Sequence, residues 1–564
     1  MSIKVILILT GIFLTFRLLD LLFPFHPDIA YSQVITASDS TVLYAFLSAD
    51  DKWRMKTELS EIMPQVRQTI VFKEDRYFYY HFGINPFAVV RALFVNTLRG
   101  KKTSGASTVT MQVVRLLKPK KRTYGNKILE MFHALQLETH FSKDEILQLY
   151  LNLVPYGGNV EGIKSASLLY FGKMPHKLSL AEVVTLAIVP NRPTSLHLGK
   201  NNALIEKERN RWLKKLPQNK VFPAKDLVDA LREPLEATRS EAPKSAPHFA
   251  LRLHKQNPTQ PILPTSLNRN IQEKVQDLAS NYSKRLKSLN INNLAVLVLD
   301  NKTRQIVAYI GSPDFKDTQN GGQVDGVQAI RSPGSTLKPL VYAIAFDEGK
   351  LTPKTVISDV PTAFGAFVPD NFDEKFHGNV SVEKALSLSL NIPAVSVLDQ
   401  IGLPLLLSKL KQSGFKQIQK DENKLGLSLI LGGCGVTLEE LVNLYANFST
   451  NAPSGWAGEG KAGLSAAAIF VVNQILTQAS RPDLPNAYQN AYHLPKIAWK
   501  TGTSYGRRDA WSIGYNARFT VGVWVGNFSG QGVPELTGSE IATPLLFNIF
   551  NTIDYNADNN WSKA

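Results

Sequence analysis

The spacing of apolar residues changes partway along the chain, and this limits the folds open to it. Between residues 62 and 200, apolar side chains recur at three- and four-residue intervals, as in ILEMFHALQLETHF and KDEILQLYLNLV. Such a period predicts amphipathic helices. Over 292–312 and 496–526, short apolar runs alternate with turn residues instead, which predicts strands. The change of period therefore predicts two domains, one mainly α and one α+β.

The domain boundaries follow from these patterns and from local composition. The chain has 564 residues, which is enough for several cores. We expect four parts: a membrane anchor over 1–25, a mainly helical domain over 35–205, a linker region over 206–264, and an α+β domain over 265–555. The linker is expected because that stretch is rich in proline and lysine. In the helical domain, Ser179 and Glu182 form a capping-box pattern that predicts a helix start.

The N-terminal segment predicts export. Twelve uncharged residues lie between Lys4 and Arg17, fewer than the roughly 20 that a spanning helix needs. The apolar character resumes after Arg17, and no small-residue cleavage site follows closely. We expect an uncleaved signal anchor that places the rest of the chain outside the cytoplasm. A cleaved export signal is the alternative, and it gives the same compartment.

The charge balance narrows the class of partner. Lys and Arg exceed Asp and Glu by 63 − 47 = 16, which favours an anionic partner such as an acidic membrane surface, a phosphorylated substrate or nucleic acid. Cys434 is the single cysteine, so an internal disulfide is excluded. We expect Cys434 to be a small core residue without thiol chemistry. No Cys/His cluster of the metal-binding kind stands out.

A serine and a lysine stand three residues apart directly after Pro333 and Gly334. If a helix begins near Ser335 and ends at Gly349, the hydroxyl lies where free N–H groups favour negative charge. Lys338 then lies on the same face as Ser335. A lysine with a depressed pKa can take the proton of such a hydroxyl and activate it. An isolated Ser-x-x-Lys pattern, however, is more often a solvated lysine on a capped helix.

Two further patterns favour the catalytic alternative. The stretch Ser389-Leu390-Asn391 begins 54 residues after Ser335, and 500–504, KTGTS, begins 165 residues after it on a predicted strand. In this order the three patterns are those of the penicillin-recognising acyltransferases. Residues 292–530 therefore resemble a penicillin-binding transpeptidase domain.

This resemblance implies a role for each residue of the three patterns. For proton transfer it implies Ser335 as the nucleophile, Lys338 as its base and Ser389 as the relay to the leaving amine. For substrate binding it implies Asn391 at the amide, Lys500 and Thr501 at the carboxylate, and Gly502 and Thr503 beside them. The backbone N–H groups of Ser335 and Thr503 would form the oxyanion hole.

A second set of chemical groups lies upstream, around two glutamates. Glu74 opens the stretch EDRYFYYHFG, and Glu130 ends a run of nine basic residues without an acidic one: Arg99, Lys101, Lys102, Arg115, Lys118, Lys120, Lys121, Arg122 and Lys127. Cations between two carboxylates suit glycosyl transfer from a diphosphate donor, because the cations, or a metal, neutralise the leaving group while one carboxylate deprotonates the acceptor hydroxyl. A lone glutamate is usually solvated, and a basic face near an anchor can simply bind acidic lipid.

Residues 40–195 resemble the mainly α, lysozyme-like glycosyltransferase domain that class A penicillin-binding proteins carry ahead of their transpeptidase. The resemblance implies that Glu74 is the base, and that Glu130 supports the departing diphosphate with Lys127 and a divalent metal, Mg or Mn. It implies substrate contacts from Ser107, Thr108, Gln112 and Asn152. Met111 and Asn126 depart from the commoner Gln and Arg of the family.

The motifs together identify the chain as a member of the class A penicillin-binding proteins, closest to the 1C type. The resemblance implies a bifunctional enzyme, anchored by a single pass in the inner membrane with both catalytic domains on the periplasmic side. It would polymerise lipid-linked disaccharide-pentapeptide and crosslink stem peptides with release of terminal D-alanine. The expected partners are the membrane, the lipid-linked precursor, the nascent glycan, β-lactams as covalent inhibitors and cell-wall machinery proteins, but no nucleic acid. The transpeptidase needs no cofactor.

Several other functions fit parts of this pattern. The second domain could be a carboxypeptidase or a β-lactamase, although no glutamate that activates water for deacylation is identifiable. The first domain could cleave glycan with its two carboxylates, as lysozymes do. The whole chain could be a penicillin-binding sensor or scaffold with weak turnover. The 1C type often has a further C-terminal domain, which we do not expect here because the chain ends soon after its last predicted strand.

Overall fold

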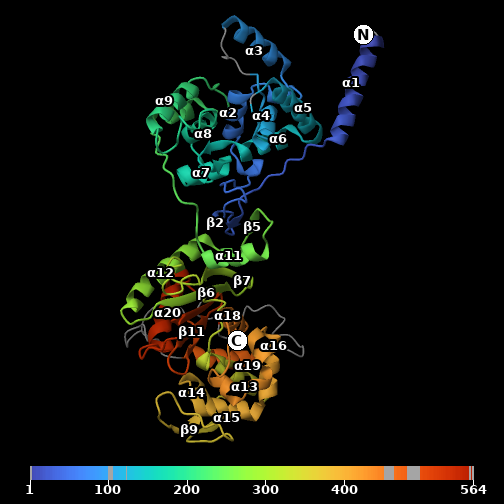
Figure 1. Ribbon diagram of the computed structural model, residues 1–564. Helices are drawn as coiled ribbons and strands as arrows, with labels where there is room; N and C mark the ends of the chain where they lie inside the picture. The colour runs from blue at the N-terminus through green and yellow to red at the C-terminus, as the bar shows by residue number, and fades with distance from the viewer. Residues whose placement is uncertain are drawn as a thin grey trace. The chain divides into compact units, whose positions relative to one another are not determined.

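The structure is a computed structural model that describes residues 3–99, 106–121, 123–449, 463–478, 496–557 and 561. It divides into two compact units, each described here by itself (Figure 1). The first unit comprises Met1–Ile35, Tyr44–Lys244 and Pro258–Leu263, and the second comprises Thr36–Leu43, Ser245–Asn257 and Pro264–Ala564. The first is mainly helical and the second is α+β, as the change of apolar period predicts.

The helices of the first unit follow the predicted amphipathic period. They are α1 (Ile3–Leu22), α2 (Pro64–Glu74), α3 (Pro86–Arg99), α4 (Val109–Leu117), α5 (Tyr124–His140), α6 (Lys143–Leu153), α7 (Ile163–Phe171), α8 (Leu180–Ile188), α9 (Asn202–Leu213) and α10 (Ala224–Arg232). Strands β3 (Pro155–Gly157) and β4 (Val160–Glu161) form a short antiparallel pair. The capping box predicted at Ser179 and Glu182 begins α8, and this prediction is confirmed.

Helix α8 lies in the core of the first unit. Seven of its side chains, Ala181 and Val183–Ile188, have at most 2% of their surface exposed, so the helix is covered on all sides. It packs against α2 and α9, while α4 packs against α5 and α6. This packing positions the ends of α2, α4 and α5, where the predicted glycosyltransferase residues lie.

The stretch expected to be a linker region, 206–264, includes three helical segments. It contains most of α9, all of α10 and α11 (Pro247–Gln256), which belongs to the second unit. Pro223 is the N-cap of α10 and Pro247 is the first residue of α11. Proline is well tolerated at a helix start, where its missing N–H leaves no bond unmade. The prolines that suggested irregular structure therefore begin helices.

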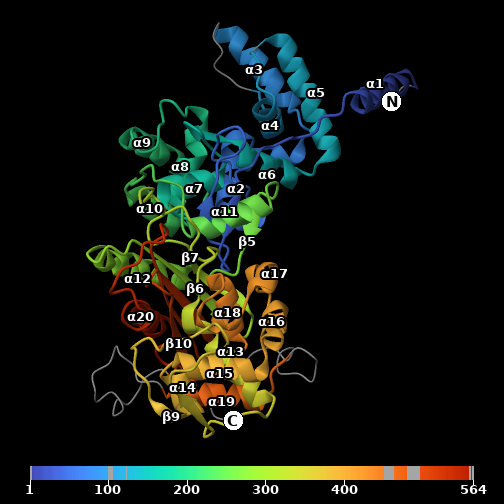
Figure 2. The ribbon, with the colours of Figure 1, turned by 60° about the horizontal axis from the view of Figure 1, so that its bottom comes forward.

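A five-stranded antiparallel sheet of order β10-β11-β12-β6-β7 organises the second unit. Its strands are β6 (Asn293–Asp300), β7 (Gln305–Ile310), β10 (Ala498–Thr503), β11 (Asp509–Tyr515) and β12 (Phe519–Gly526), which confirms the predicted strands. Alternate residues of β6 enter two different cores: 294, 296 and 298 pack with α12 (Arg269–Lys287) and α20 (Thr543–Ile553), whereas 295, 297 and 299 face α13 (Lys338–Asp347) and α18 (Leu438–Ala446). Helices therefore cover both faces of the sheet (Figures 1 and 2).

The remaining elements of the second unit surround the α13 side of the sheet. They are β8 (Val356–Asp359), β9 (Gly378–Ser381), α14 (Val382–Ser387), α15 (Asn391–Ile401), α16 (Leu403–Gln412), α17 (Lys416–Asp421) and α19 (Ala466–Thr477). A separate small sheet has the order β2-β1-β5, with β1 at Val34–Thr36, β2 at Val42–Ala45 and β5 at Ile262–Pro264.

Segment α1 is helical, as an anchor requires. Among the residues that the structure describes, however, no single helix has both the length and the apolar character needed to cross a bilayer; only α15 and α16 together, bent by 90°, reach that length and composition. The membrane anchor expected over 1–25 therefore stays a prediction.

Candidate active sites

The junction between α14 and α15 brings Ser389 and Asn391 to one cavity of the second unit. Helix α14 ends at Ser387, and α15 begins at Asn391. Between them Ser389 has φ 58°, a left-handed conformation that a non-glycine residue adopts only when its surroundings enforce it. The resulting tight turn also directs the backbone carbonyls of 389 and 390 toward Lys338.

Lys338, at the first position of α13, is fully buried. Its Nζ donates to the carbonyls of Ser389 at 2.6 Å and Leu390 at 3.1 Å, and to Asn391 Oδ1 at 2.7 Å. Burial, together with the charge of Lys500, holds the pKa of Lys338 well below its usual value. A lysine with such a pKa can act as a general base near neutral pH.

Lys500 reaches the same turn from strand β10. Its Nζ donates to the Ser389 hydroxyl at 2.7 Å and to its neighbour's carbonyl, that of Thr501, at 2.9 Å. Burial lowers the pKa of Lys500 to about 7. The two lysines therefore meet at Ser389, although they lie 162 residues apart in the sequence.

Two glycines allow β10 to approach the turn that carries Ser335. Ser335 lies in a 3₁₀ turn, Gly334–Leu337, that leads into α13. A Cβ on Gly334, whose φ is 55°, would meet the backbone oxygen of Thr503 at 2.5 Å. A Cβ on Gly502 would meet the carbonyl oxygen of Pro333 at 2.3 Å. Gly502 therefore serves close packing of the strand, and its predicted contact with substrate is not needed to explain it.

A cavity of about 310 Å³ collects the motif side chains of the second unit. Its lining includes Ser335, Ser389, Asn391, Lys500, Thr501 and Thr503. Among the described residues, no hydrogen bond joins the Ser335 side chain to Lys338. Thr503 Oγ1 accepts a hydrogen bond of 3.0 Å from the Gly538 N–H, which fixes its side chain at the rim.

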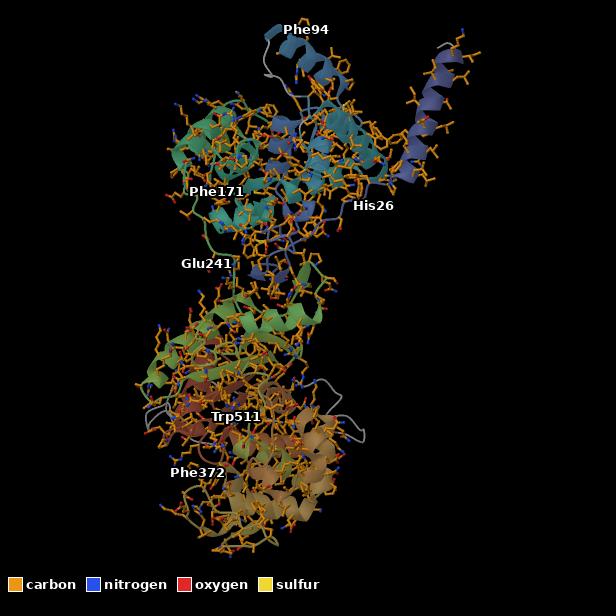
Figure 3. The ribbon with its side chains drawn as sticks, viewed as in Figure 1. His26, Phe94, Phe171, Glu241, Phe372 and Trp511 are labelled. Carbon is orange, nitrogen blue, oxygen red and sulfur yellow. The ribbon has the colours of Figure 1, made fainter. Side chains whose placement is uncertain are left out.

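A buried support behind Asn391 escaped the sequence analysis. Asp359, which is fully buried, accepts two hydrogen bonds from Asn371 Nδ2, at 2.8 and 3.0 Å, and one from the His377 backbone N–H at 2.9 Å. Asn371 Oδ1 in turn accepts the backbone N–H of Asn391 at 2.8 Å. Nothing in the local sequence predicts this arrangement, because Asp359 ends a strand and Asn371 lies in an irregular loop. The next residue, Phe372, lines the cavity and is labelled in Figure 3.

In the first unit, Glu74 lies at the C-terminal end of α2, beside a cavity of about 1080 Å³. Its Oε1 forms an ion pair with Lys73, and its Oε2 accepts a hydrogen bond of 3.3 Å from Gln112 on α4. Only 9% of the Glu74 side chain is exposed. Thr108, the N-cap of α4, lines the same cavity and donates to the Gly83 carbonyl at 2.6 Å.

Glu130 lines a second cavity, of about 300 Å³, on α5. Lys127 Nζ bridges Glu130 Oε1 at 2.6 Å and Ser107 Oγ at 2.9 Å. The basic residues Arg115, Lys118, Lys120, Lys121 and Lys127 line this cavity. Of the predicted basic run, Lys101, Lys102, Arg122 and the Arg99 side chain lie outside the described residues. Ser107 lines both cavities, so the two carboxylates occupy adjoining spaces.

The two departures from the family pattern differ in their surroundings. Met111 is 1% exposed and packs in the core of the unit. Asn126 lines the basic cavity, and its Nδ2 donates to the Lys121 carbonyl at 2.8 Å. Of the two, only Asn126 is placed to meet a substrate.

Asn152 does not line either cavity, and its predicted substrate contact is corrected here. Its side chain is 1% exposed. Oδ1 accepts from the Thr57 N–H at 2.8 Å, and Nδ2 donates to the carbonyls of Thr57 at 2.9 Å and Gln148 at 2.8 Å. Every hydrogen bond goes to the backbone, so Asn152 joins α6 to an extended segment rather than binding a ligand.

The side chains near Glu130 offer little to a metal ion by themselves. Within the described part of the chain, no three His, Cys, Asp or Glu side chains gather into a metal-binding group. One oxygen of Glu130 is already paired with Lys127. A magnesium ion is often held by one carboxylate together with substrate phosphates, so these residues fit an ion shared with a diphosphate.

Comparison with known families matches both units. A family model described as Transglycosylase matches residues 39–217, and one described as Penicillin binding protein transpeptidase domain matches residues 294–550. Together they cover the residues that line the three cavities described above.

Several whole proteins are similar to the chain over most of its length. It is 37% identical over 548 residues to Penicillin-binding protein 1C of Escherichia coli, covering 94% of the chain and 69% of that protein. It is 29% identical to Penicillin-binding protein 1F of Bacillus subtilis, covering 97% and 81%. The crystal structure of Penicillin-Binding Protein 1A from Haemophilus influenzae shares the fold, with a TM-score of 0.54 and 16% identity over 94% of the chain and 93% of that chain.

Proposed function

Since this chain belongs to the class A penicillin-binding proteins of the 1C type, which are peptidoglycan glycosyltransferases and D-Ala-D-Ala transpeptidases, we propose which of its residues perform the two reactions. Glycan polymerisation takes place at the cavities of Glu74 and Glu130, and crosslinking takes place at Ser335. The convergence of Lys338, Ser389, Asn391 and Lys500 on one cavity with Ser335 is the observation that carries the proposal.

In the crosslinking reaction, Ser335 Oγ attacks the carbonyl between the two terminal D-alanines of a stem peptide. Lys338, whose pKa is lowered by burial and by Lys500, takes the hydroxyl proton. The C–N bond then breaks, and the Ser389 hydroxyl passes a proton to the leaving amine of D-alanine. An acceptor amine attacks the acyl-Ser335 ester and restores the hydroxyl. This sequence follows the general scheme of nucleophilic catalysis with an activated serine.

Asn391 and Lys500 orient the substrate in this scheme. Asn391 is held by Lys338 through its Oδ1 and by the Asp370 carbonyl through its Nδ2, so its amide has one orientation before substrate arrives. The cation of Lys500 pairs with the terminal carboxylate of the stem peptide, beside Thr501 on β10. β-Lactams carry a carboxylate and a strained amide, so they bind as covalent inhibitors in the same position.

A fluorescent penicillin tests the crosslinking site. The full chain should be labelled, and Ser335→Ala should abolish the labelling, whereas Ser332→Ala should not, because the Ser332 hydroxyl donates to the Gly432 carbonyl instead of lining the cavity. Labelling of folded Ser335→Ala at the wild-type rate would overturn the assignment of the nucleophile.

In the polymerisation reaction, Glu74 removes the proton of the acceptor sugar hydroxyl as that oxygen attacks the anomeric carbon of the donor. The bond to the lipid diphosphate breaks, and the cations of the basic cavity, with Lys127 held by Glu130 and Ser107, stabilise the negative charge that leaves. Groups placed where charge develops commonly supply the largest part of catalysis. A divalent ion held by Glu130 and the diphosphate would add positive charge there; chelation by EDTA during polymerisation tests this.

Two contacts and an exposed helix in the first unit support a function at a membrane surface. Asp20, near the end of α1, lies 3.0 Å from His140 Nε2 on α5, and Lys118 of the basic cavity stacks on the Phe25 ring at 4.7 Å. On α3, Phe87, Val90 and Phe94 each expose 66% or more of their surface; Phe94 is labelled in Figure 3. Helix α3 lines the Glu74 cavity, which adjoins the basic cavity at Ser107, and an exposed apolar helix in that place suits a lipid-tethered substrate. We therefore propose a single-pass inner-membrane protein with both units on the periplasmic side.

Incubation with lipid-linked disaccharide-pentapeptide tests the polymerisation site. Wild type should form glycan chains, and Glu74→Gln should abolish them because the amide cannot accept the proton. Polymer formed by Glu74→Gln at the wild-type rate would show that another group is the base.

Two of the other functions considered from the sequence, a carboxypeptidase and a sensor or scaffold, are separated by the products of the same incubation. D-alanine release without crosslinks would indicate a carboxypeptidase, and penicillin labelling without D-alanine release would indicate a sensor or scaffold. Crosslinked muropeptides that disappear in Ser335→Ala are the expected result. Cell-wall machinery proteins as further partners remain a proposal that co-purification from cells would test.

A further inference from the structure

The base proposed for polymerisation is held in a network that the two reactions described above do not use. Lys73, directly before Glu74, exposes only 3% of its side chain, and Glu74 exposes 9%. Lys73 Nζ pairs with Glu74 Oε1 and lies 5.8 Å from the centre of the Trp212 ring on α9. A buried lysine needs a partner, because an unpaired charge away from water is costly.

Asn191 completes the network from the end of the segment that follows α8. With its amide turned to suit both neighbours, Asn191 donates to Glu74 Oε1 at 3.0 Å and accepts from Lys73 Nζ at 2.6 Å. Helix α8 packs against both α2 and α9 (Figure 1). One carboxylate oxygen therefore has a partner from its own helix, Lys73, and a partner from a segment distant in the sequence, Asn191.

The two oxygens of Glu74 differ in how firmly they are held. Oε1 is bound by both Lys73 and Asn191. Oε2 has a single long contact, 3.3 Å from Gln112 Nε2. We propose that Lys73 and Asn191 are positioning residues that clamp Oε1 and leave Oε2 as the oxygen that takes the proton from the acceptor sugar. This inference rests on the proposed role of Glu74 as the base.

Glu74 lies in buried surroundings, where an adjacent cation such as Lys73 matters more than it would in water. Tyr150 and Tyr156 are fully buried behind it, and burial, with the negative charge of Glu74, raises the pKa of both tyrosines. The Tyr156 hydroxyl has no hydrogen-bond partner among the described residues. The carboxylate oxygen Oδ2 of the adjacent Asp75 lies 2.9 Å from His81 Nε2. Buried surroundings disfavour an ionised carboxylate, and an adjacent cation favours it.

The test compares initial polymerisation rates of the full chain and its variants between pH 5 and 9. Lys73→Met removes one of the two partners of Oε1, so the carboxylate is no longer held with Oε2 toward the acceptor. We expect kcat to fall by about tenfold or more across this pH range and KM for the lipid-linked donor to stay within about twofold. Lys73→Arg should restore most of the rate. Asn191→Leu should lower kcat without changing KM.

Lys215→Met is the matched control. Lys215 also stacks on the Trp212 ring, at 4.7 Å, but it is exposed and does not contact Glu74. Its pH profile should superimpose on that of wild type. If Lys73→Met does not fold, as judged by its circular dichroism, Lys73→Gln carries the same test because it removes the charge and keeps a hydrogen-bond donor.

Two outcomes would overturn the inference. A Lys73→Met protein that loses thermal stability but keeps the wild-type kcat and pH profile would show a purely structural ion pair. A Lys73→Met deficit that lies in KM for the donor, with kcat unchanged, would show that Lys73 supports binding and does not position the base. Glu74→Gln separates this inference from the proposed function: if that variant polymerises, the base is elsewhere, whereas if it is inactive and the Lys73→Met profile is unchanged, only the positioning role fails.

Discussion

Lys500 donates a hydrogen bond of 2.7 Å to the hydroxyl of Ser389. The same hydroxyl lies 3.5 Å from Lys338 Nζ, so Ser389 stands between two buried amines. A hydroxyl in this position can accept a proton from one side and donate to the other. The relay role implied for Ser389 therefore has a physical basis in the cavity, and the charge of one lysine influences the other.

Lys500→Met should change the pH dependence of penicillin acylation. The charge of Lys500 is one cause of the lowered pKa of Lys338, so its removal raises the pKa of Lys338, and more of that base is protonated at low pH. Since the pKa of Lys500 is about 7, its charge is present below that pH and lost above it. The wild-type-to-variant rate ratio should therefore be about tenfold larger at pH 5.5 than at pH 8.5.

The acylation rate with a fluorescent penicillin measures this ratio. Lys384→Met, an exposed position on the neighbouring helix α14, should leave the profile unchanged. A ratio that is constant across pH would mean that the charge of Lys500 does not influence the acylation step.

Gly334→Ala should slow acylation strongly without unfolding the unit. The added Cβ would meet the oxygen and nitrogen of Thr503 at 2.5 and 2.7 Å, so β10 must move away from Ser335. A displacement of this kind can cost about 100-fold in rate. Gly349→Ala is the matched control, because its φ is 64° but nothing lies within 4 Å of the new Cβ. It should cost about 1–2 kcal/mol of unfolding free energy and keep the acylation rate. Equal acylation rates for the two variants would contradict the argument.

Asp359→Ala should destabilise the second unit and slow acylation together. The substitution removes the acceptor of Asn371 and of the His377 N–H, and buried hydrogen bonds to a charged group are worth about 1.5–3 kcal/mol. Asn371 then no longer fixes Asn391. Denaturant unfolding and penicillin labelling measure the two effects. Asp370→Ala should be neutral, since only the backbone carbonyl of Asp370 contacts Asn391; unchanged labelling in folded Asp359→Ala would show that the support is dispensable.

Asn152→Ala should lower stability and leave the chemistry intact. Its hydrogen bonds join Thr57 and Gln148 in the core, and leaving those groups unpaired costs about 1–3 kcal/mol. Polymerisation per folded molecule should stay within about twofold of wild type. Asn126→Ala, at the basic cavity, should do the reverse and raise KM for the donor while the denaturation midpoint stays constant. A large rise in KM for Asn152→Ala would restore its predicted role in binding.

The periodic parts of the fold could be predicted because their signals are local. The three- and four-residue spacing over 62–200 and the apolar runs of β6, β7 and β10–β12 depend on residues close in sequence. The prolines over 206–264 were misleading because proline both interrupts helices and begins them. Which of the two applies depends on whether an apolar face, such as Leu227 and Ala230 on α10, finds a surface to cover.

For the sites, the sequence by itself determined which chemical groups are present. These are a serine and a lysine one turn apart, a later Lys-Thr-Gly strand, and two glutamates around a basic run. Only the tertiary structure decided which of these groups meet and what holds them. The partners of Asn391, Lys500 and Glu74 lie between one and 117 residues away along the chain. A buried asparagine that bonds only to backbone groups, such as Asn152, cannot be told by residue type from an asparagine that faces a cavity. Burial and pairing depend on how segments that are distant in the sequence pack together, and the local spacing of residues does not encode that packing.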